Sequence, residues 1–121
     1  MIKTLRVGVL SYADMKARTK AIARGELRPK ADDPKVWFTS LESLARVLSS
    51  KNRVLLALIA DAKPASIKDL AQLSGRAPPN VSRTLKAFER YGLVRLIREE
   101  GGRVRPESLA RAVEFSIPLH N

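Results

Sequence analysis

Cysteine is absent from this chain of 121 residues, and histidine occurs only once, as His120. A chain without cysteine has no disulfide, no thiolate metal site and no cysteine nucleophile. The single histidine next to the chain end lacks the base and the orienting group that catalysis requires around it. The sequence also contains no GxxxxGK[ST] nucleotide-binding loop. We therefore expect no enzyme, no metal site and no cofactor.

Long hydrophobic runs and aromatic residues are also scarce. The longest apolar run, Val54–Ala60, is far shorter than the ~20 residues of a membrane-spanning helix. Lys3 and Arg6 interrupt the apolar N-terminal stretch, which does not resemble a signal peptide. We expect the chain to remain in the cytoplasm, associated with the nucleoid. Hydrophobic residues make up 45% and aromatic ones 5%, which predicts a folded chain with an aliphatic core.

Acidic residues are few compared with basic ones. The chain has 12 Asp and Glu against 23 Lys and Arg, which gives a net charge of +11. This excess favours a nucleic acid partner, because binding to phosphates releases condensed counterions. An anionic membrane surface is a rival partner, but it usually requires a basic helix with bulky apolar residues on its other face. Since many small basic domains bind no polyanion, the distribution of the charges must decide.

The first third of the chain predicts a strand, a helix and a loop. Residues 4–10 alternate between apolar and polar side chains, which indicates a half-buried strand. Ser11 is the expected N-cap of a helix over residues 11–24, with Asp14 three positions later. Lys16, Lys20 and Arg24 form a basic stripe on that helix, which we interpret as a solvated face. Residues 26–35, with their prolines and aspartates, predict a loop or linker.

Several helices are expected in the middle of the chain. Thr39 with Glu42 and Ser66 with Asp69 each have the spacing of a capping box. The segment 53–60 is apolar nearly all round, which predicts a buried central helix. Gly75 stands where a tight turn between two helices requires glycine. Further helical residues follow the prolines at 78 and 79, and we expect that helix over residues 79–91, with Gly92 as its left-handed cap.

The hydrophobic period changes after Gly92. Residues 93–99 predict a strand, Gly101 and Gly102 predict a hairpin turn, and residues 103–106 predict the returning strand. Residues 107–112 are ambiguous and fit one helical turn. Alternation over residues 113–117 predicts a final strand.

Helices followed by a hairpin, with a short turn between the last two helices, predict a winged helix-turn-helix. The expected fold class is α+β, mostly α, with a three-helix core and a β-hairpin wing. We expect a strand–helix extension over residues 1–38, the winged domain over 39–106 and a C-terminal strand over 107–121. The two terminal segments are candidates for dimerisation.

The helix 79–91 has two distinct faces. At about 100° per residue, Val81, Leu85 and Phe88 gather on one side with Thr84. The opposite side carries cations and a hydroxyl without any acid, from Pro79, Ser82, Arg83, Lys86 and Arg90. The major groove of DNA admits one helix, whose polar side chains contact base edges while its cations contact phosphates. We therefore expect the helix to enter the major groove.

The same region resembles a known family of proteins. The segment from Ser66 to Gly75 and the segment from Asn80 to Val94 are similar to winged helix-turn-helix transcriptional regulators of the MarR and ArsR type. Ser82-Arg83, Leu85-Lys86, Glu89 and Gly92-Leu93-Val94 are the most characteristic part. The chain as a whole is similar to small bacterial predicted regulators, some of which act as antitoxins. The resemblance implies a DNA-binding function.

Three departures from this family stand out. MarR proteins dimerise through long terminal helices, whereas the ends of this chain predict strands. ArsR metal sensors bind their metal through cysteine or histidine ligands, whereas this chain has no cysteine and a single histidine. The expected wing tip also carries Glu99 and Glu100, which repel phosphates, although arginines flank them.

The candidate DNA-binding residues belong to the helix expected after Ser66, the helix 79–91, the turn between these two helices and the wing. They are Ser66, Lys68, Arg76, Pro79, Asn80, Ser82, Arg83, Lys86, Arg90, Arg98, Arg103 and Arg105. Arg83 can fork onto a guanine, and Asn80 or Ser82 can contact a base edge or a phosphate. For the wing arginines, including Arg95, the alternative is ordinary exposed charge.

The sequence supports a dimeric repressor that binds duplex DNA. We expect Leu5–Leu10 and Val113–Leu119 to form strands that meet, within one chain or between two, with Trp37, Phe38 and Leu41 over the junction. One alternative is an antitoxin that binds a toxin protein and regulates its own operon. Another is an RNA-binding or enzyme accessory domain.

Overall fold

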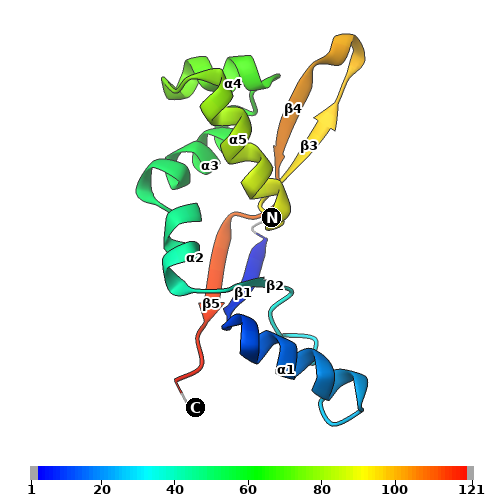
Figure 1. Cartoon of the computed structure of the whole chain (residues 1–121). Coiled ribbons are helices and arrows are strands. Elements are labelled where there is room, and N and C mark those ends of the chain that lie inside the picture. The colour runs from blue at the N-terminus through cyan, green and yellow to red at the C-terminus, as the bar shows by residue number, and fades with distance from the viewer. Residues whose placement is uncertain (1–2, 120–121) are drawn as a thin grey trace. The chain divides into compact units, whose positions relative to one another are not determined.

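The structure, a computed structural model, describes residues 3–119 and contains both helices and strands (Figure 1). The chain folds as two compact units. The first unit consists of the residues up to Leu5 together with Val47–Ala112, and the second consists of Arg6–Arg46 together with the segment from Val113 onward. The expectation for His120 lies outside the described residues. The domain boundaries 1–38, 39–106 and 107–121 stay a prediction.

The first unit is a winged helix-turn-helix. Its helices are α3 (Ser50–Ala62), α4 (Ile67–Ser74) and α5 (Pro78–Arg90), and its wing is the hairpin of β3 (Val94–Arg98) and β4 (Val104–Ser108). Helix α4 packs on α3 and α5, while α5 contacts β3 and α3 contacts β4. The core takes buried apolar side chains from all three helices, from the residue before β3 and from the first residue of β3, namely Leu55, Ile59, Leu70, Ala71, Val81, Leu85, Phe88, Leu93 and Val94. The predicted α+β fold class is confirmed.

Helix α3 is less buried than its sequence predicted. Its apolar run extends nearly all round the helix, but only Leu55 and Ile59 are buried, and Val54 is 60% exposed. The expectation of a fully buried central helix was wrong, because α4 and the hairpin cover one side of α3 only. Ser49 caps the helix by accepting a hydrogen bond from the backbone N–H of Asn52.

The turn between α4 and α5 follows the predicted chemistry. Ser66 caps α4 by accepting from the backbone N–H of Asp69 at 3.1 Å. Gly75 ends α4 in the left-handed conformation, with a φ of 71° that favours glycine. Ala77 is the N-cap of α5, and the two prolines occupy the first two helical positions. Two helices separated by so short a turn have a fixed mutual orientation.

The hairpin is longer than expected on its returning side. β3 and β4 are antiparallel, with Arg95 opposite Glu107 and Ile97 opposite Arg105. A 3₁₀ turn, η1 (Glu100–Gly102), joins them. The sequence left residues 107–112 ambiguous. Residues 107 and 108 belong to β4 because they pair with β3, and they do not form the helical turn that the sequence also allowed.

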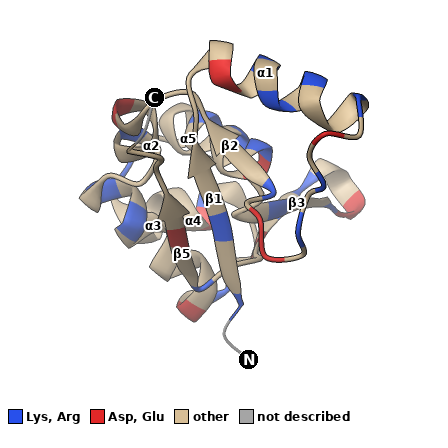
Figure 2. Cartoon of the chain, turned by 90° about the horizontal axis from the view of Figure 1, so that it is seen from below, with Lys and Arg blue, Asp and Glu red and all other residues tan. Residues whose placement is uncertain are grey.

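The second unit contains a three-stranded sheet. Its strands are β1 (Thr4–Val9), β2 (Val36–Phe38) and β5 (Ala112–Ser116), and β1 lies between the other two (Figure 2). β1 and β2 are parallel, with Gly8 opposite Trp37. The two terminal strands therefore meet within one chain, which is one of the two arrangements that the sequence predicted. The strand at 36–38 was not expected.

Helix α1 (Tyr12–Ala23) follows β1 directly. Ser11 caps it as predicted, accepting from the backbone N–H of Asp14 at 3.1 Å. None of the residues of α1 is buried. Arg18 connects the helix with the rest of its unit, because its guanidinium lies 4.9 Å from the centroid of the Trp37 ring and 3.5 Å from a carboxylate oxygen of Asp33. Phe38 and Leu44 are buried.

Helix α2 (Leu41–Val47) begins one residue later than its capping signal suggested. The N-cap is Ser40, whose hydroxyl accepts from the backbone N–H of Ser43 at 3.0 Å. The expected capping box of Thr39 and Glu42 was therefore wrong. Thr39 directly follows the last residue of β2, and the next hydroxyl along the chain takes the capping position.

Candidate nucleic-acid interface

Helix α5 presents one apolar and one cationic face, as predicted. Val81, Leu85 and Phe88 are completely buried in the core of the first unit. On the other side, Pro79 and the three cations Arg83, Lys86 and Arg90 are exposed, while Ser82 is half-buried. Because the apolar face fixes the rotation of the helix about its axis, these cations must point toward solvent.

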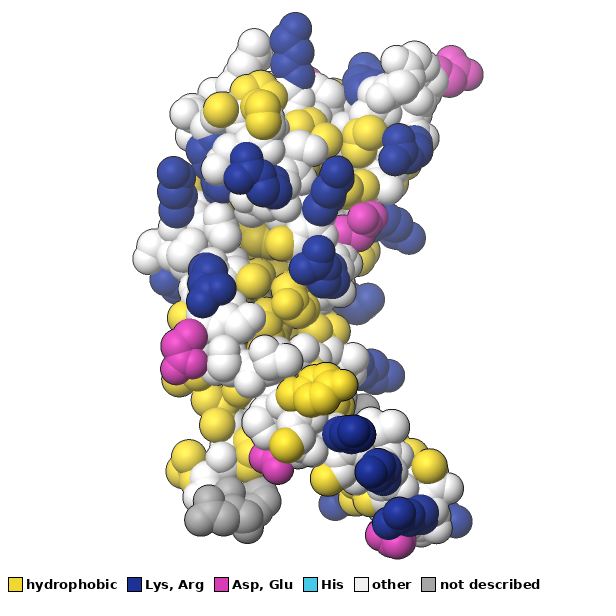
Figure 3. Space-filling model, viewed as in Figure 1, with side chains coloured by type: hydrophobic (Ala, Val, Ile, Leu, Met, Phe, Trp, Pro, Cys, Tyr) yellow, Lys and Arg dark blue, Asp and Glu magenta, His cyan; other side chains and the backbone are white. Residues whose placement is uncertain are grey.

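The cations of this face have no acidic neighbour within ion-pair distance. Over residues 3–119, no ion pair involves Arg83, Lys86 or Arg90. In the upper part of Figure 3, which draws the helices α3–α5 and the hairpin, Lys and Arg side chains outnumber Asp and Glu side chains. This face therefore carries positive charge that the described protein does not neutralise, and it suits a polyanion.

Arg76 and Asn80 lie at the start of α5 and contact each other. Nε of Arg76 donates to Oδ1 of Asn80 at 2.8 Å. Two further bonds of the same guanidinium reach Oγ1 of Thr84 at 2.8 Å and Oδ1 of Asn52 at 3.1 Å. Arg76 thus connects the turn before α5 with two residues of α5 and with α3, and most of its side chain's hydrogen-bonding capacity is used inside the protein.

Asn52 connects Arg76 with Val47, the first residue of the longer segment of the unit. Its Nδ2 donates to the backbone carbonyl of Val47 at 3.0 Å, while its Oδ1 accepts from Arg76. Arginine has only donors, so the atoms that face it must be acceptors, and the orientation of both asparagine amides follows from this. We name the side chains of Asn52, Arg76, Asn80 and Thr84 the Arg76 network.

Helix α4 contributes two of the candidate residues. The hydroxyl of Ser66 is half-buried and serves as the cap of α4. Lys68 is exposed, whereas Leu70 and Ala71 of the same helix are buried in the core. Its charge is available to a partner, whereas the Ser66 hydroxyl already accepts a backbone hydrogen bond.

One face of the wing carries a series of ion pairs. Arg95 donates to Oε1 of Glu107, and Arg105 lies 3.7 Å from Oε2 of the same carboxylate. Glu99 lies 3.6 Å from Arg105 and 3.7 Å from Arg103. We name these five residues the wing ion-pair ladder. Its two acids offset much of the charge of its three arginines, which reduces their attraction for phosphates.

The pKa of Glu107 reflects this ladder. The hydrogen bond from Arg95 is the largest cause that lowers the pKa below its ordinary value of 4.5, and the charges of Arg95 and Arg105 act in the same direction. Partial desolvation of the carboxylate opposes them. Glu107 is therefore ionised at neutral pH.

Arg98 lies on the other face of the wing. Opposed residues of antiparallel strands share a face, and Arg98 is opposite Val104, while Leu96 on the same face is opposite the buried Pro106. Arg98 is exposed, and within the described part of the chain it takes part in no ion pair. Of the three predicted wing arginines, Arg98 therefore keeps its full charge for a partner, whereas Arg103 and Arg105 are paired.

The basic stripe of α1 belongs to the other unit. Lys16, Lys20 and Arg24 are exposed, and no ion pair among residues 3–119 involves them. Figure 2 shows basic residues along most of α1 and an acidic one in its first turn. We keep the interpretation of a solvated face.

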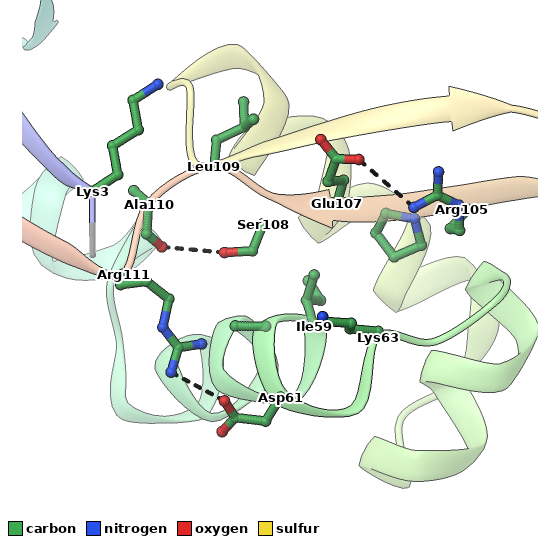
Figure 4. Close-up of a pocket in the computed structure, with 12 residues that line it drawn as sticks. Lys3, Ile59, Asp61, Lys63, Arg105, Glu107, Ser108, Leu109, Ala110 and Arg111 are labelled. Atoms are coloured by element: carbon green, nitrogen blue, oxygen red, sulfur yellow. Dashed lines mark hydrogen bonds and ion pairs between the residues drawn. The ribbon is translucent and has the colours of Figure 1, made fainter. Parts of the chain in front are cut away.

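A depression of about 720 Å³ lies between α3 and β4 (Figure 4). Ile59, Asp61 and Lys63 line it on one side, and β4 with the loop after it lines the other. Arg111 donates to Asp61 at 3.0 Å, so these two charges offset each other. No residue of α5 lines the depression, which therefore is not part of the cationic face.

Metal-ligand clusters and membrane-spanning helices are both absent from the described residues. From Lys3 to Leu119, no three His, Asp or Glu residues gather as ligands for a metal ion. No helix within that range is both long enough and apolar enough to span a membrane.

The sequence had indicated the cationic face but not the two sets of polar contacts around it. Arg76 and Asn80 were expected to contact DNA, and their mutual bond had no helical spacing signal because Arg76 lies before α5. The contact with Asn52 joins residues 24 positions apart and has no local signal. The ladder could have been inferred from opposed charges, once the hairpin register was known.

A family model named HVO_A0114 matches residues 47–115, which is more than half of the chain. The chain belongs to the HVO_A0114 family. The match begins at Val47, the first residue of the longer segment of the first unit. It includes α3, α4, α5, the hairpin and most of β5. In this HVO_A0114 protein, the family segment therefore includes the cationic face, the Arg76 network and the wing.

One solved structure is similar to this HVO_A0114 protein at a low level. It is described as a crystal structure of the predicted DNA-binding transcriptional regulator from E. coli. The two chains are 16% identical with a TM-score of 0.48, and the match covers 84% of this chain and 86% of that chain. Similarity at this level does not establish a function. The comparison with curated proteins gives no match.

Proposed function

We propose that this chain is a sequence-specific, double-stranded-DNA-binding transcriptional regulator of the MarR and ArsR type, not an enzyme, and that it acts in the cytoplasm. One observation carries the proposal. Helix α5 follows a tight turn, is buried along its whole apolar face, and exposes Arg83, Lys86 and Arg90 without an acidic partner among the described residues. A rigidly held helix with an uncompensated cationic face suits the major groove.

The residues of this surface have different roles in the proposal. Arg83 contacts a base edge, because a guanidinium can fork onto the two acceptors of guanine. Lys86, Arg90 and Lys68 contact phosphates, which position the helix without reading the sequence. Arg98 approaches the backbone or the adjacent minor groove from the wing. Arg103 and Arg105 contribute less, because Glu99 and Glu107 offset their charges.

We further propose that the protein acts as a dimeric repressor, in which two copies occupy half-sites about one helical turn, ~34 Å, apart. In the three-stranded sheet β1 has a neighbour on both sides, so β2 and β5 are the strands of this sheet whose outer edge can pair with another chain. β5 is the longer of the two, and its Phe115 is 56% exposed. We propose a two-fold contact through β5. Sedimentation that shows a monomer at micromolar concentration, with and without DNA, would contradict it.

Binding measurements with three nucleic acids test the main proposal. Fluorescence anisotropy with duplex DNA, single-stranded DNA and double-stranded RNA of one sequence should give the highest affinity for duplex DNA. The affinity should fall steeply with salt, because phosphate contacts release counterions. A preference for single strands or for RNA would favour the alternative of an RNA-binding or accessory domain.

An antitoxin is the second candidate function. Tyr12 and Phe115 of the second unit are 76% and 56% exposed, and large apolar side chains at a surface favour a protein partner. In this proposal the second unit binds a toxin while α5 binds the operon. A small adjacent reading frame that is toxic when expressed alone, and whose product co-purifies with this chain, would support the antitoxin function.

A further inference from the structure

The orientation of the Asn80 amide determines which chemical groups α5 offers at its start. Arg76 has only donors, so the atom of Asn80 that accepts from its Nε must be the carbonyl oxygen Oδ1. The amide nitrogen Nδ2 then points away from Arg76, and Asn80 is exposed. Asn80 therefore presents N–H donors to a partner, while one of the two lone pairs of its carbonyl oxygen is taken by Arg76.

The Arg76 side chain is held in place by its other bonds. Its two terminal nitrogens donate to Thr84 at 2.8 Å and to Asn52 at 3.1 Å. Asn52 is in turn fixed by its bond to the carbonyl of Val47. The guanidinium is thus anchored to α3 and to the second turn of α5, and a flip of the Asn80 amide would place two donors against each other.

The backbone at this point provides few donors of its own. Pro78 and Pro79 occupy the first two positions of α5 and have no N–H, and the N-cap Ala77 has no side-chain cap. The free N–H groups at the start of a helix can bind an anion, but the start of α5 lacks two of them. Within the first turn of α5, residues 78–81, Asn80 has the one polar side chain, so its Nδ2 group is the side-chain donor of this turn.

We propose that Arg76 is a positioning residue, which orients Asn80 so that it donates to guanine and not to adenine; this inference rests on the proposed DNA-binding function. Asparagine recognises adenine by accepting from N6 while donating to N7. The bond from Arg76 occupies one of the two lone pairs of Oδ1 and turns Nδ2 away from Arg76. It therefore disfavours the adenine pair, in which the oxygen and the nitrogen of the amide must face the base together. Guanine offers acceptors at both N7 and O6, which match an amide that presents its Nδ2 group to the base.

Selection of bound sequences from random duplex DNA, carried out with the full-length protein and its variants, tests the proposal. The wild type should enrich guanine about tenfold at one position of its site, and Asn80→Ala should lose that preference. Asn80→Asp keeps the bond with Arg76 but turns an acceptor outward, so it should prefer cytosine or adenine there. Arg76→Met should lose the guanine preference or admit adenine.

Two controls separate positioning from stability and from charge. Lys68→Met also removes one exposed cation near α5, and it should weaken binding without altering the base preference. Thermal unfolding shows whether Arg76→Met remains folded. If it does not, Asn80→Asp tests the donor directly, and Arg76→Lys, which lacks the fork of donors, should retain less of the preference than the wild type.

The outcomes distinguish this inference from the function on which it rests. Sequence-specific binding in which Asn80→Ala weakens all sequences alike would show a phosphate contact and overturn the inference alone. The same holds if the wild type prefers adenine at the position that Asn80→Ala loses, or if folded Arg76→Met keeps the guanine preference. A wild type that enriches no sequence would contradict the proposed function itself.

Discussion

Arg95 and Glu107 face each other across the hairpin, and the Arg95 guanidinium donates a hydrogen bond to the Glu107 carboxylate. This pair is part of the wing ion-pair ladder. The acids of the ladder offset much of the charge of Arg95, Arg103 and Arg105. We therefore expect these three arginines mainly to stabilise the hairpin. Its contribution to DNA binding then depends mainly on Arg98.

Replacing Glu107 by glutamine should destabilise the protein most at neutral pH. The hydrogen bond from Arg95 holds the pKa of Glu107 below its ordinary value, so the folded state binds the proton less tightly than the unfolded chain. The stabilisation is fully present above the pKa of the unfolded chain and is lost as the pH falls through the folded pKa. The difference in free energy of unfolding between wild type and Glu107→Gln should shrink when urea titrations are repeated from pH 7 down to pH 3. A constant difference would contradict the assignment.

Arg98 and Arg103 should differ in their effect on DNA binding, although both are exposed wing arginines. Arg98→Ala should reduce the slope of log affinity against log salt by about 0.9, because one phosphate contact is lost. Arg103→Ala should leave the slope nearly unchanged, since Glu99 offsets that charge. The two variants form a matched pair. Equal slopes for both would show that the ion pairs of the ladder do not reduce the contribution of Arg103 to DNA binding.

Arg83→Ala should reduce affinity for the selected site by about 1–3 kcal/mol, and affinity for random duplex by much less. The reason is that a base contact is sequence-specific, whereas a phosphate contact is not. Lys86→Ala is the matched control and should weaken both duplexes alike. Anisotropy titrations at one salt concentration measure all four values. If Arg83→Ala also weakens both duplexes alike, Arg83 does not read a base.

Gly8→Ala should destabilise the second unit by roughly 1–3 kcal/mol, as overpacking does in a dense core. A Cβ atom at Gly8 would collide with the ring of Trp37 on the neighbouring strand. Thr4→Ala on the same strand is exposed and should change stability by less than about 0.5 kcal/mol. Chemical denaturation measures both changes in the free energy of unfolding. In a Trp37→Leu background, where a smaller side chain replaces the ring, Gly8→Ala should cost less stability. A Gly8→Ala variant as stable as the wild type would contradict this packing.

Local signals in the sequence predicted the elements that local chemistry determines. Ser11 and Ser66 cap helices, and Gly75 and Gly92 take left-handed conformations, because each requirement involves only a few neighbouring residues. The cap at Ser40 was missed in favour of Thr39, since the two hydroxyls are adjacent and the end of β2 decides between them.

Features that depend on distant residues were not predictable in the same way. β2 has only three residues and exists through its pairing with β1. The exposure of Val54 depends on which elements cover α3, and its apolar neighbours in sequence do not reveal this. The bond between Arg76 and Asn52 likewise requires α3 and the start of α5 to be in place. The cationic face was predictable because it follows from helical periodicity alone.

The salt dependence of duplex binding tests the central claim most directly. We expect the wild type to bind duplex DNA with an affinity that falls steeply with salt. The variant Arg83→Ala/Lys86→Ala/Arg90→Ala should lose about 1.8 units of the slope of log affinity against log salt, about 0.9 for each of the phosphate contacts of Lys86 and Arg90, and it should also lose the base contact of Arg83. A triple variant that keeps the wild-type affinity and slope would contradict a DNA-binding role for α5.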